Sequence, residues 1–209
     1  MREAVNAEDV TQILCVGRSA VEHASPKVRS LVLADLFDHS VIADELVNFD
    51  ACFYCLGVSS AGQAEEFYSR ITYDLTLSIA DVLEPRNPNM TFVYMCAQGS
   101  DPTGNSKVMW ARVRGRLENS LFERSFKKVY SLRPGYIQPM DGIKSRTALY
   151  RVAYDVFGFI YPLLTRLIPD SVTSTRAIGK AMLNLARGYE SPAALAPADI
   201  NRLAKAEEN

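Results

Sequence analysis

Five short runs of apolar residues constrain the fold of this chain more than any other feature of its sequence. They occupy residues 12–16, 31–34, 51–56, 91–96 and 128–132. Runs that are apolar throughout, rather than at every second residue, indicate strands covered on both faces, as in parallel sheets. The sequence therefore predicts an α/β fold built on such a sheet.

Helical stretches fill the gaps between these runs. Residues 65–83 carry apolar side chains at helical spacing and stop before Pro85. Further helices are expected over residues 42–47, 108–122, 148–167 and 173–187, whereas residues 198–209 are expected to be frayed. Strands alternating with helices predict a doubly wound parallel sheet with right-handed crossovers, which binds ligands at the carboxyl ends of its strands.

Composition narrows the class of protein. A chain of 209 residues suits one domain, and 23 basic against 24 acidic residues give no excess charge for binding nucleic acid. No apolar stretch reaches the roughly 20 residues of a membrane span, and the polar N-terminus is unlike a signal peptide. We expect one cytoplasmic domain over residues 1–209, with 138–190 as its small C-terminal substrate or cap part.

Two local motifs resemble known sites but lack essential parts. Gly57 and Gly62 have the spacing of a phosphate-binding P-loop, but the Lys and Ser or Thr that must follow are absent. Cys52 and Cys55 form C-x-x-C inside a strand run, where residues three apart point to opposite faces. No second Cys or His pair completes a metal site, so we expect no metal and reduced, buried cysteines.

The sequence gives little indication of a hydrolase or of a membrane-binding protein. His23 and His39 fall in loops, and the sequence has no G-x-S-x-G elbow for a catalytic serine. Residues 149–167 are amphipathic and aromatic, which suits a membrane or partner surface. A helix that covers a substrate cleft explains the same pattern, and we favour it.

Polar residues follow the predicted strands. Arg18 comes after the first run, where a dinucleotide fold places a cation against the adenosine 2′-phosphate and so selects NADP over NAD. The alternative is a solvated arginine at a strand end. Asp35 and Leu36 either border an adenine ring or close the second strand with a turn.

Four segments in the expected order resemble atypical short-chain dehydrogenase/reductases, in the branch of the Tat-interacting oxidoreductase and the NAD-dependent epimerase/dehydratase-like proteins. These segments are residues 16–19, 49–62, 110–118 and 132–137, and the resemblance covers about residues 2–190. It implies a Rossmann-like fold that binds NADP(H). The implied contacts are Arg18 and Ser19 to the 2′-phosphate, Asp35 and Leu36 to adenine, Leu56, Gly57 and Val58 to pyrophosphate and ribose, and Pro134, Gly135, Tyr136 and Ile137 to nicotinamide.

The chain departs from the family pattern at its beginning. The sequence contains no G-x-x-G-x-x-G, the turn that places a pyrophosphate on a helix N-terminus. Residues 1–5 align with the middle of the helix that follows this turn. We therefore expect an N-terminally shortened sheet without the first strand and phosphate loop, through truncation, a misplaced start or loss.

The second departure concerns the catalytic positions. Family reductases use Tyr-x₃-Lys, in which the lysine lowers the pKa of the tyrosine. The matching residues are Trp110 and Arg114, and Ser100 is the hydroxyl nearest to the usual serine position. Two functions remain open. One is an NADP(H)-binding reductase-like or epimerase-like protein, active or vestigial, with a small-molecule substrate; the other is a non-catalytic interaction protein that has lost the cofactor.

Overall fold

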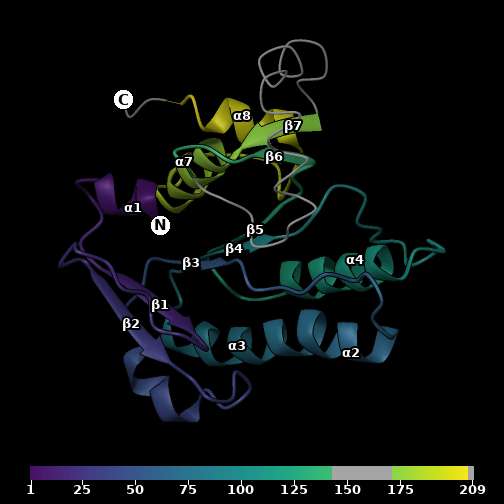
Figure 1. The fold of residues 1–209 in the computed structure, drawn as a ribbon, viewed down its shortest axis with the longest axis horizontal. Coiled ribbons are helices and arrows are strands. Elements are labelled where there is room, and N and C mark those ends of the chain that lie inside the picture. The colour runs from purple at the N-terminus through teal and green to yellow at the C-terminus, as the bar shows by residue number, and fades with distance from the viewer. Residues whose placement is uncertain (143–170, 207–209) are drawn as a thin grey trace.

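Four parallel strands form the main sheet, in the order β3-β4-β5-β8 (Figure 1). The structure is a computed structural model that describes residues 1–142 and 171–206. The strands are β3 (Ala51–Tyr54), β4 (Thr91–Met95), β5 (Lys128–Leu132) and β8 (Ala194–Leu195). Each neighbouring pair is parallel, so every connection crosses over a face of the sheet.

Two further strand pairs flank the main sheet. They are β1 (Ile13–Gly17) with β2 (Val28–Val32), and β6 (Tyr136–Gln138) with β7 (Val172–Ser174), and both are parallel. Within the described residues, neither pair joins the main sheet through strand hydrogen bonds. The strand predicted at 31–34 begins earlier than expected, because the ladder with β1 starts at Val28.

Helices cover both faces of the main sheet (Figure 1). On one face lie α2 (Glu65–Ser69), the π-helical turn η2 (Arg70–Asp74), α3 (Leu75–Leu83), the 3₁₀ turn η3 (Glu84–Arg86) and α4 (Met109–Phe122). On the other lie α1 (Arg2–Asn6), α7 (Thr175–Ala186) and α8 (Pro197–Leu203). The 3₁₀ helix η1 (Ser40–Glu45) replaces the helix predicted at 42–47. The predicted helix over 148–167 lies outside the described residues.

The core explains why the strand runs are apolar throughout. In β4, Phe92 and Tyr94 pack in one hydrophobic cluster with Leu117 of α4, and Val93 packs in another with Ile178 of α7. A strand that faces a core on both sides needs apolar side chains at consecutive positions. The predicted α/β fold with a parallel sheet covered on both faces is confirmed.

Two smaller expectations are wrong. Residues 198–203 are not frayed, because Ile200 and Leu203 of α8 are buried in the cluster that α7 forms on the sheet. Cys55 is exposed rather than buried, since β3 ends at Tyr54 and Cys55 begins the next loop. Cys96 is buried as expected.

Candidate functional site

The carboxyl ends of β1, β2, β3 and β5 carry the residues that the sequence predicts to bind a cofactor. Arg18 and Ser19 follow β1, and residues 56–58 and 134–135 follow β3 and β5. Leu36, beyond β2, and Leu56 pack against the same hydrophobic cluster. The loops after β2 and β3 therefore rest on the same core, although β2 and β3 belong to different sheets.

Arg18 is exposed and unpaired at the end of β1. Every other arginine in residues 1–142 and 171–206 has a hydrogen-bond, ion-pair or aromatic-ring partner, whereas Arg18 has none. A free guanidinium offers a planar set of donors that matches a phosphate. Its position beyond a parallel strand is where open α/β sheets bind ligands.

The two glycines among the predicted cofactor residues differ in their surroundings. A Cβ atom placed on Gly57 meets no atom within 4 Å, so the backbone after β3 borders open space. A Cβ atom on Gly135 would lie 2.4 Å from the Gln98 side chain and 2.5 Å from the Ser171 carbonyl oxygen. The Gln98 N–H also donates to the Pro134 carbonyl, at 3.0 Å. Gly57 therefore permits close approach by a ligand, whereas Gly135 permits close packing of the chain.

Asp35 forms a local turn at the end of β2. Its carboxylate accepts a hydrogen bond from the Phe37 N–H at 2.9 Å. This contact is the turn that the sequence offered as one alternative for Asp35. It leaves the second carboxylate oxygen free of that bond, so the turn and an adenine contact are compatible.

The three predicted catalytic residues all contact other parts of the protein. The Ser100 hydroxyl donates to Glu118, and the Arg114 Nε donates to the hydroxyl of buried Tyr68, each at 2.8 Å. The half-buried Trp110 ring lies against Gly99, where an added Cβ would be 3.3 Å from the indole Cη2. Each side chain therefore has a structural role at this site.

Tyr94 and Tyr136 are the other phenols near these positions. Burial, followed by the nearby Cys96, raises the pKa of Tyr94 far above its usual value. Its ring lies 6.4 Å from that of Tyr54 within the core. The Tyr136 hydroxyl donates to Gln138 at 2.8 Å. Tyr94 is thus a packing residue of the core.

Sequence reasoning missed a buried ion pair beside the site. Glu118 is completely buried and accepts from the Arg133 Nε and Nη2, at 2.7 Å each. It also accepts from the hydroxyls of Ser100 and Ser131, at 2.8 and 2.5 Å. The sequence does contain one indication of this ion pair: Glu118 follows Leu117 on the apolar face of the helix predicted over residues 108–122, where a carboxylate needs a partner.

The two cysteines of the C-x-x-C motif lie at the end of β3, Cys52 within the strand and Cys55 just beyond it. Burial in the sheet, with the nearby Cys55 as a second cause, raises the pKa of Cys52 to about 12, which keeps its thiol protonated. In the described residues no group of three or more His, Cys, Asp or Glu has the grouping needed for a metal ion. Nor does any helix in that part of the chain have the length and apolarity to span a bilayer.

One similarity is to a protein of known sequence. The chain is 29% identical over 140 residues to Protein FMP52-2, mitochondrial, of Scheffersomyces stipitis. The match covers 66% of this chain and 59% of that protein, less than two thirds of its length. No family model matches.

Solved structures cover more of the chain. A UDP-N-acetylglucosamine 4-epimerase from Methanobrevibacter ruminantium matches 97% of this chain and 76% of its own, with a TM-score of 0.64 and 14% identity. WbmF of Bordetella bronchiseptica, in complex with NAD⁺, matches 92% and 69%, with a TM-score of 0.57 and 14% identity. A short-chain dehydrogenase/reductase of Saccharomyces cerevisiae matches 91% and 87%, with a TM-score of 0.58 and 16% identity.

These matches define the class of fold. The chain has the Rossmann-like α/β fold of short-chain dehydrogenase/reductases and NAD-dependent epimerases, as its sequence predicts. At such identities the likeness is one of architecture, and chemistry must be argued from the residues at the site.

Proposed function

We propose that the protein binds NADP(H) at the carboxyl ends of its parallel strands. The observation that carries this proposal is the unpaired Arg18 beyond β1, a cation with no structural role in the described residues. A 2′-phosphate gives Arg18 the anionic partner that it lacks. The NAD⁺ complex of the similar WbmF supports a dinucleotide as the ligand class.

The other predicted contacts follow from position. Ser19 lies next to Arg18, and Asp35 and Leu36 follow the strand that pairs with β1. The open backbone at Gly57, with Leu56 and Val58, suits the pyrophosphate and ribose. Pro134, Gly135, Tyr136 and Ile137 follow β5 on the nicotinamide side. When bound, the cofactor would supply hydride transfer.

The contacts available to the cofactor within the described residues lie at the strand ends. No G-x-x-G-x-x-G turn occurs in residues 1–209, so the groups proposed here for the phosphates are Arg18 and the backbone after β3. We therefore expect binding to depend strongly on the 2′-phosphate.

Arg18→Ala is expected to weaken NADPH binding about ten- to hundredfold, because a hydrogen bond to a charged group contributes roughly 1.5–3 kcal/mol. Affinity for NADH, which lacks the 2′-phosphate, should not change. Calorimetric titration of both nucleotides measures the two effects. Arg202→Ala is the matched control, since Arg202 is an exposed arginine on α8 paired with Asp199. Equal NADPH affinity in Arg18→Ala and the unaltered protein, or no binding of NADPH, would refute the proposal.

A second candidate is a non-catalytic interaction protein with the same fold. It is favoured by the contacts of Arg114 with Tyr68 and of Ser100 with Glu118, which engage both groups in packing. Trp110 has no proton to exchange in the working pH range. A melting temperature that does not change with excess NADPH supports this candidate, since a bound ligand must stabilise the folded state.

If the protein is an enzyme, its reaction takes place beside the cofactor, at the carboxyl ends of the strands. We propose Ser100, Trp110 and Arg114 as the residues that face the substrate, with residues 138–190 as the substrate or cap part of the single domain. Screening small carbonyl compounds and nucleotide sugars for NADPH oxidation or epimerisation tests this role.

We also propose a cytoplasmic location, although the relative from Scheffersomyces stipitis is named mitochondrial. Cell fractionation decides between the two.

A further inference from the structure

Arg114 of α4 carries a charge that no carboxylate in the described residues neutralises. Its side chain is half-buried, and its Nε donates to the Tyr68 hydroxyl at 2.8 Å. Its Nη1 and Nη2 have no hydrogen-bond or ion-pair partner in residues 1–142 and 171–206. Arginines with limited exposure are usually paired with an acid, because it is costly to remove a charge from water. The terminal edge of this guanidinium is therefore open to an anion.

The acids beside this part of α4 are already engaged. Glu118 lies one turn beyond Arg114, but its carboxylate forms the buried ion pair with Arg133. Asp101, in the loop between β4 and α4, accepts hydrogen bonds from backbone N–H groups of residues 103–106 in its own loop. Glu118 and Arg133 neutralise each other, which leaves the charge of Arg114 uncompensated.

Arg114 lies at the carboxyl end of β4, beside an aromatic ring. Burial raises the pKa of Cys96, which follows β4, and Arg114 is among the nearby groups that oppose this rise. Trp110 precedes Arg114 by one helical turn, so the two side chains are neighbours on the surface of α4. The Trp110 ring lies against Gly99, in the loop after β4. A cationic edge and an apolar ring thus adjoin each other at the end of this strand.

We propose that Arg114 binds the carboxylate of a small substrate whose apolar body packs on the Trp110 ring. This inference rests on the proposed function, since it names the substrate class of the same strand-end site. The terminal edge of a guanidinium donates two parallel hydrogen bonds to the two oxygens of a carboxylate. A carboxylate matches one uncompensated positive charge, whereas a phosphate group carries up to two negative charges. The Tyr68 hydroxyl holds the Arg114 Nε in place.

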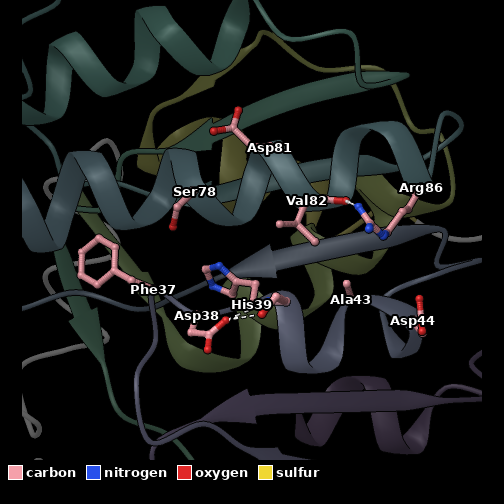
Figure 2. Close-up of a pocket in the computed structure, with 10 residues that line it drawn as sticks. Phe37, Asp38, His39, Ala43, Asp44, Ser78, Asp81, Val82 and Arg86 are labelled. Carbon is pink, nitrogen blue, oxygen red and sulfur yellow. Dashed lines mark hydrogen bonds between the residues drawn. The ribbon is translucent and has the colours of Figure 1, made fainter.

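A groove along α3 is another place for a small molecule, but its charges disfavour an acid. It is lined by three aspartates and one arginine (Asp38, Asp44, Asp81 and Arg86), as Figure 2 shows. A carboxylate in this groove would be repelled by more charges than attract it. A carboxylate ligand should therefore be detected at Trp110 and not along α3.

Trp110 is the only tryptophan of the 209 residues, so its fluorescence reports directly on this site. The test is a titration of the full chain with cyclohexanecarboxylate and, separately, with the uncharged cyclohexanecarboxamide. We expect a saturable change of Trp110 emission with the acid. The amide should bind at least about tenfold more weakly, as expected for one lost charged contact. No saturable change up to about 50 mM acid, equal affinity for the amide, or tighter binding of inorganic phosphate would overturn the proposal.

Variants of α4 locate the site. Arg114→Gln removes the charge and should weaken binding of the acid about tenfold or more. Arg114→Lys keeps the charge without the planar edge and should give an intermediate affinity. Arg116→Gln is the matched control, because Arg116 is exposed on the same helix and donates to Ser69. Unchanged affinity in Arg114→Gln, or equal losses in Arg114→Gln and Arg116→Gln, would overturn the assignment. The preference of the unaltered protein for acid over amide tests the proposal even if Arg114→Gln does not fold.

The result is separable from that of the nucleotide titration. Binding of the acid that depends on Arg114, in a protein that does not bind NADPH, would refute the proposed cofactor and support the carboxylate site. Binding of NADPH without a preference for the acid over the amide would refute the carboxylate site alone.

Discussion

Replacing Glu118 by alanine is expected to lower the free energy of unfolding by about 3–5 kcal/mol, the usual cost of breaking a buried ion pair on one side. Glu118 has no exposed surface and accepts four hydrogen bonds, from Ser100, Ser131 and twice from Arg133. Alanine would leave all four donors without their acceptor. The Arg133 guanidinium, only 26% exposed, would lose its counter-charge.

Urea unfolding of the variant measures this loss. Glu65→Ala is the control, because Glu65 forms an exposed ion pair with Arg112 and its removal should cost less than about 1 kcal/mol. Glu118→Gln keeps the side-chain volume and removes the charge, so it separates the ion pair from packing. A Glu118→Ala protein within about 1 kcal/mol of the unaltered protein would show that the network contributes little.

The same carboxylate makes stability depend on acid pH. Burial alone raises the pKa of Glu118, but the hydrogen bonds from Arg133, Ser131 and Ser100 outweigh it and hold the pKa below its ordinary value of 4.5. The stabilisation is therefore complete above pH 4.5 and is lost as the pH falls through the lower pKa of the folded state. Melting temperatures of Glu118→Gln and the unaltered protein should converge as the pH falls below 4.5. A constant difference would contradict this assignment.

Gly115→Ala should also destabilise the protein, against the helix preference for alanine. Alanine in a helix interior is favoured over glycine by about 0.8–1.0 kcal/mol. Here, however, the new Cβ would lie 1.9 Å from the Asp101 carbonyl oxygen and 2.5 Å from the Pro102 nitrogen. The loop is held on both sides of Gly115, since the Asp101 N–H donates to the Ala111 carbonyl and Asn119 donates to the Pro102 carbonyl, each at 2.9 Å.

We expect a loss of at least about 2 kcal/mol from this overpacking, or a melting temperature lower by roughly 4–8 °C. Gly179→Ala is a matched control in α7, where the new Cβ would meet only the Glu3 side chain, at 2.7 Å. That side chain can rotate away, so the change should stay within about 1 kcal/mol. If both variants melt together, the loop over Gly115 moves aside without cost.

The sequence predicted the strands and most helices because their signals are local. Apolar runs mark β4 and β5 to within a residue, and helical spacing marks the continuous stretch from Glu65 to Leu83. Residues 198–203 were misjudged, because Ile200 and Leu203 become a helix face only when α7 and the sheet are present to bury them. The sequence also placed Arg18 at a strand end, since the first apolar run stops just before it and β1 ends at Gly17.

The partners of the side chains at the site were decided by the tertiary structure alone. Arg114 contacts Tyr68, 46 positions away, and Glu118 of α4 contacts Arg133, which follows β5 and is 15 positions away. The unpaired state of Arg18 is likewise known only from the folded chain, where every other arginine of residues 1–142 and 171–206 has a partner. The sequence alone determined which helices and strands form, because the spacing of apolar residues that marks each element is a property of residues close together in the chain. The tertiary structure decided which charged side chains have a partner and which are free to bind a ligand. These pairings depend on distances between segments that are remote in the sequence, and such distances are fixed only when the chain folds.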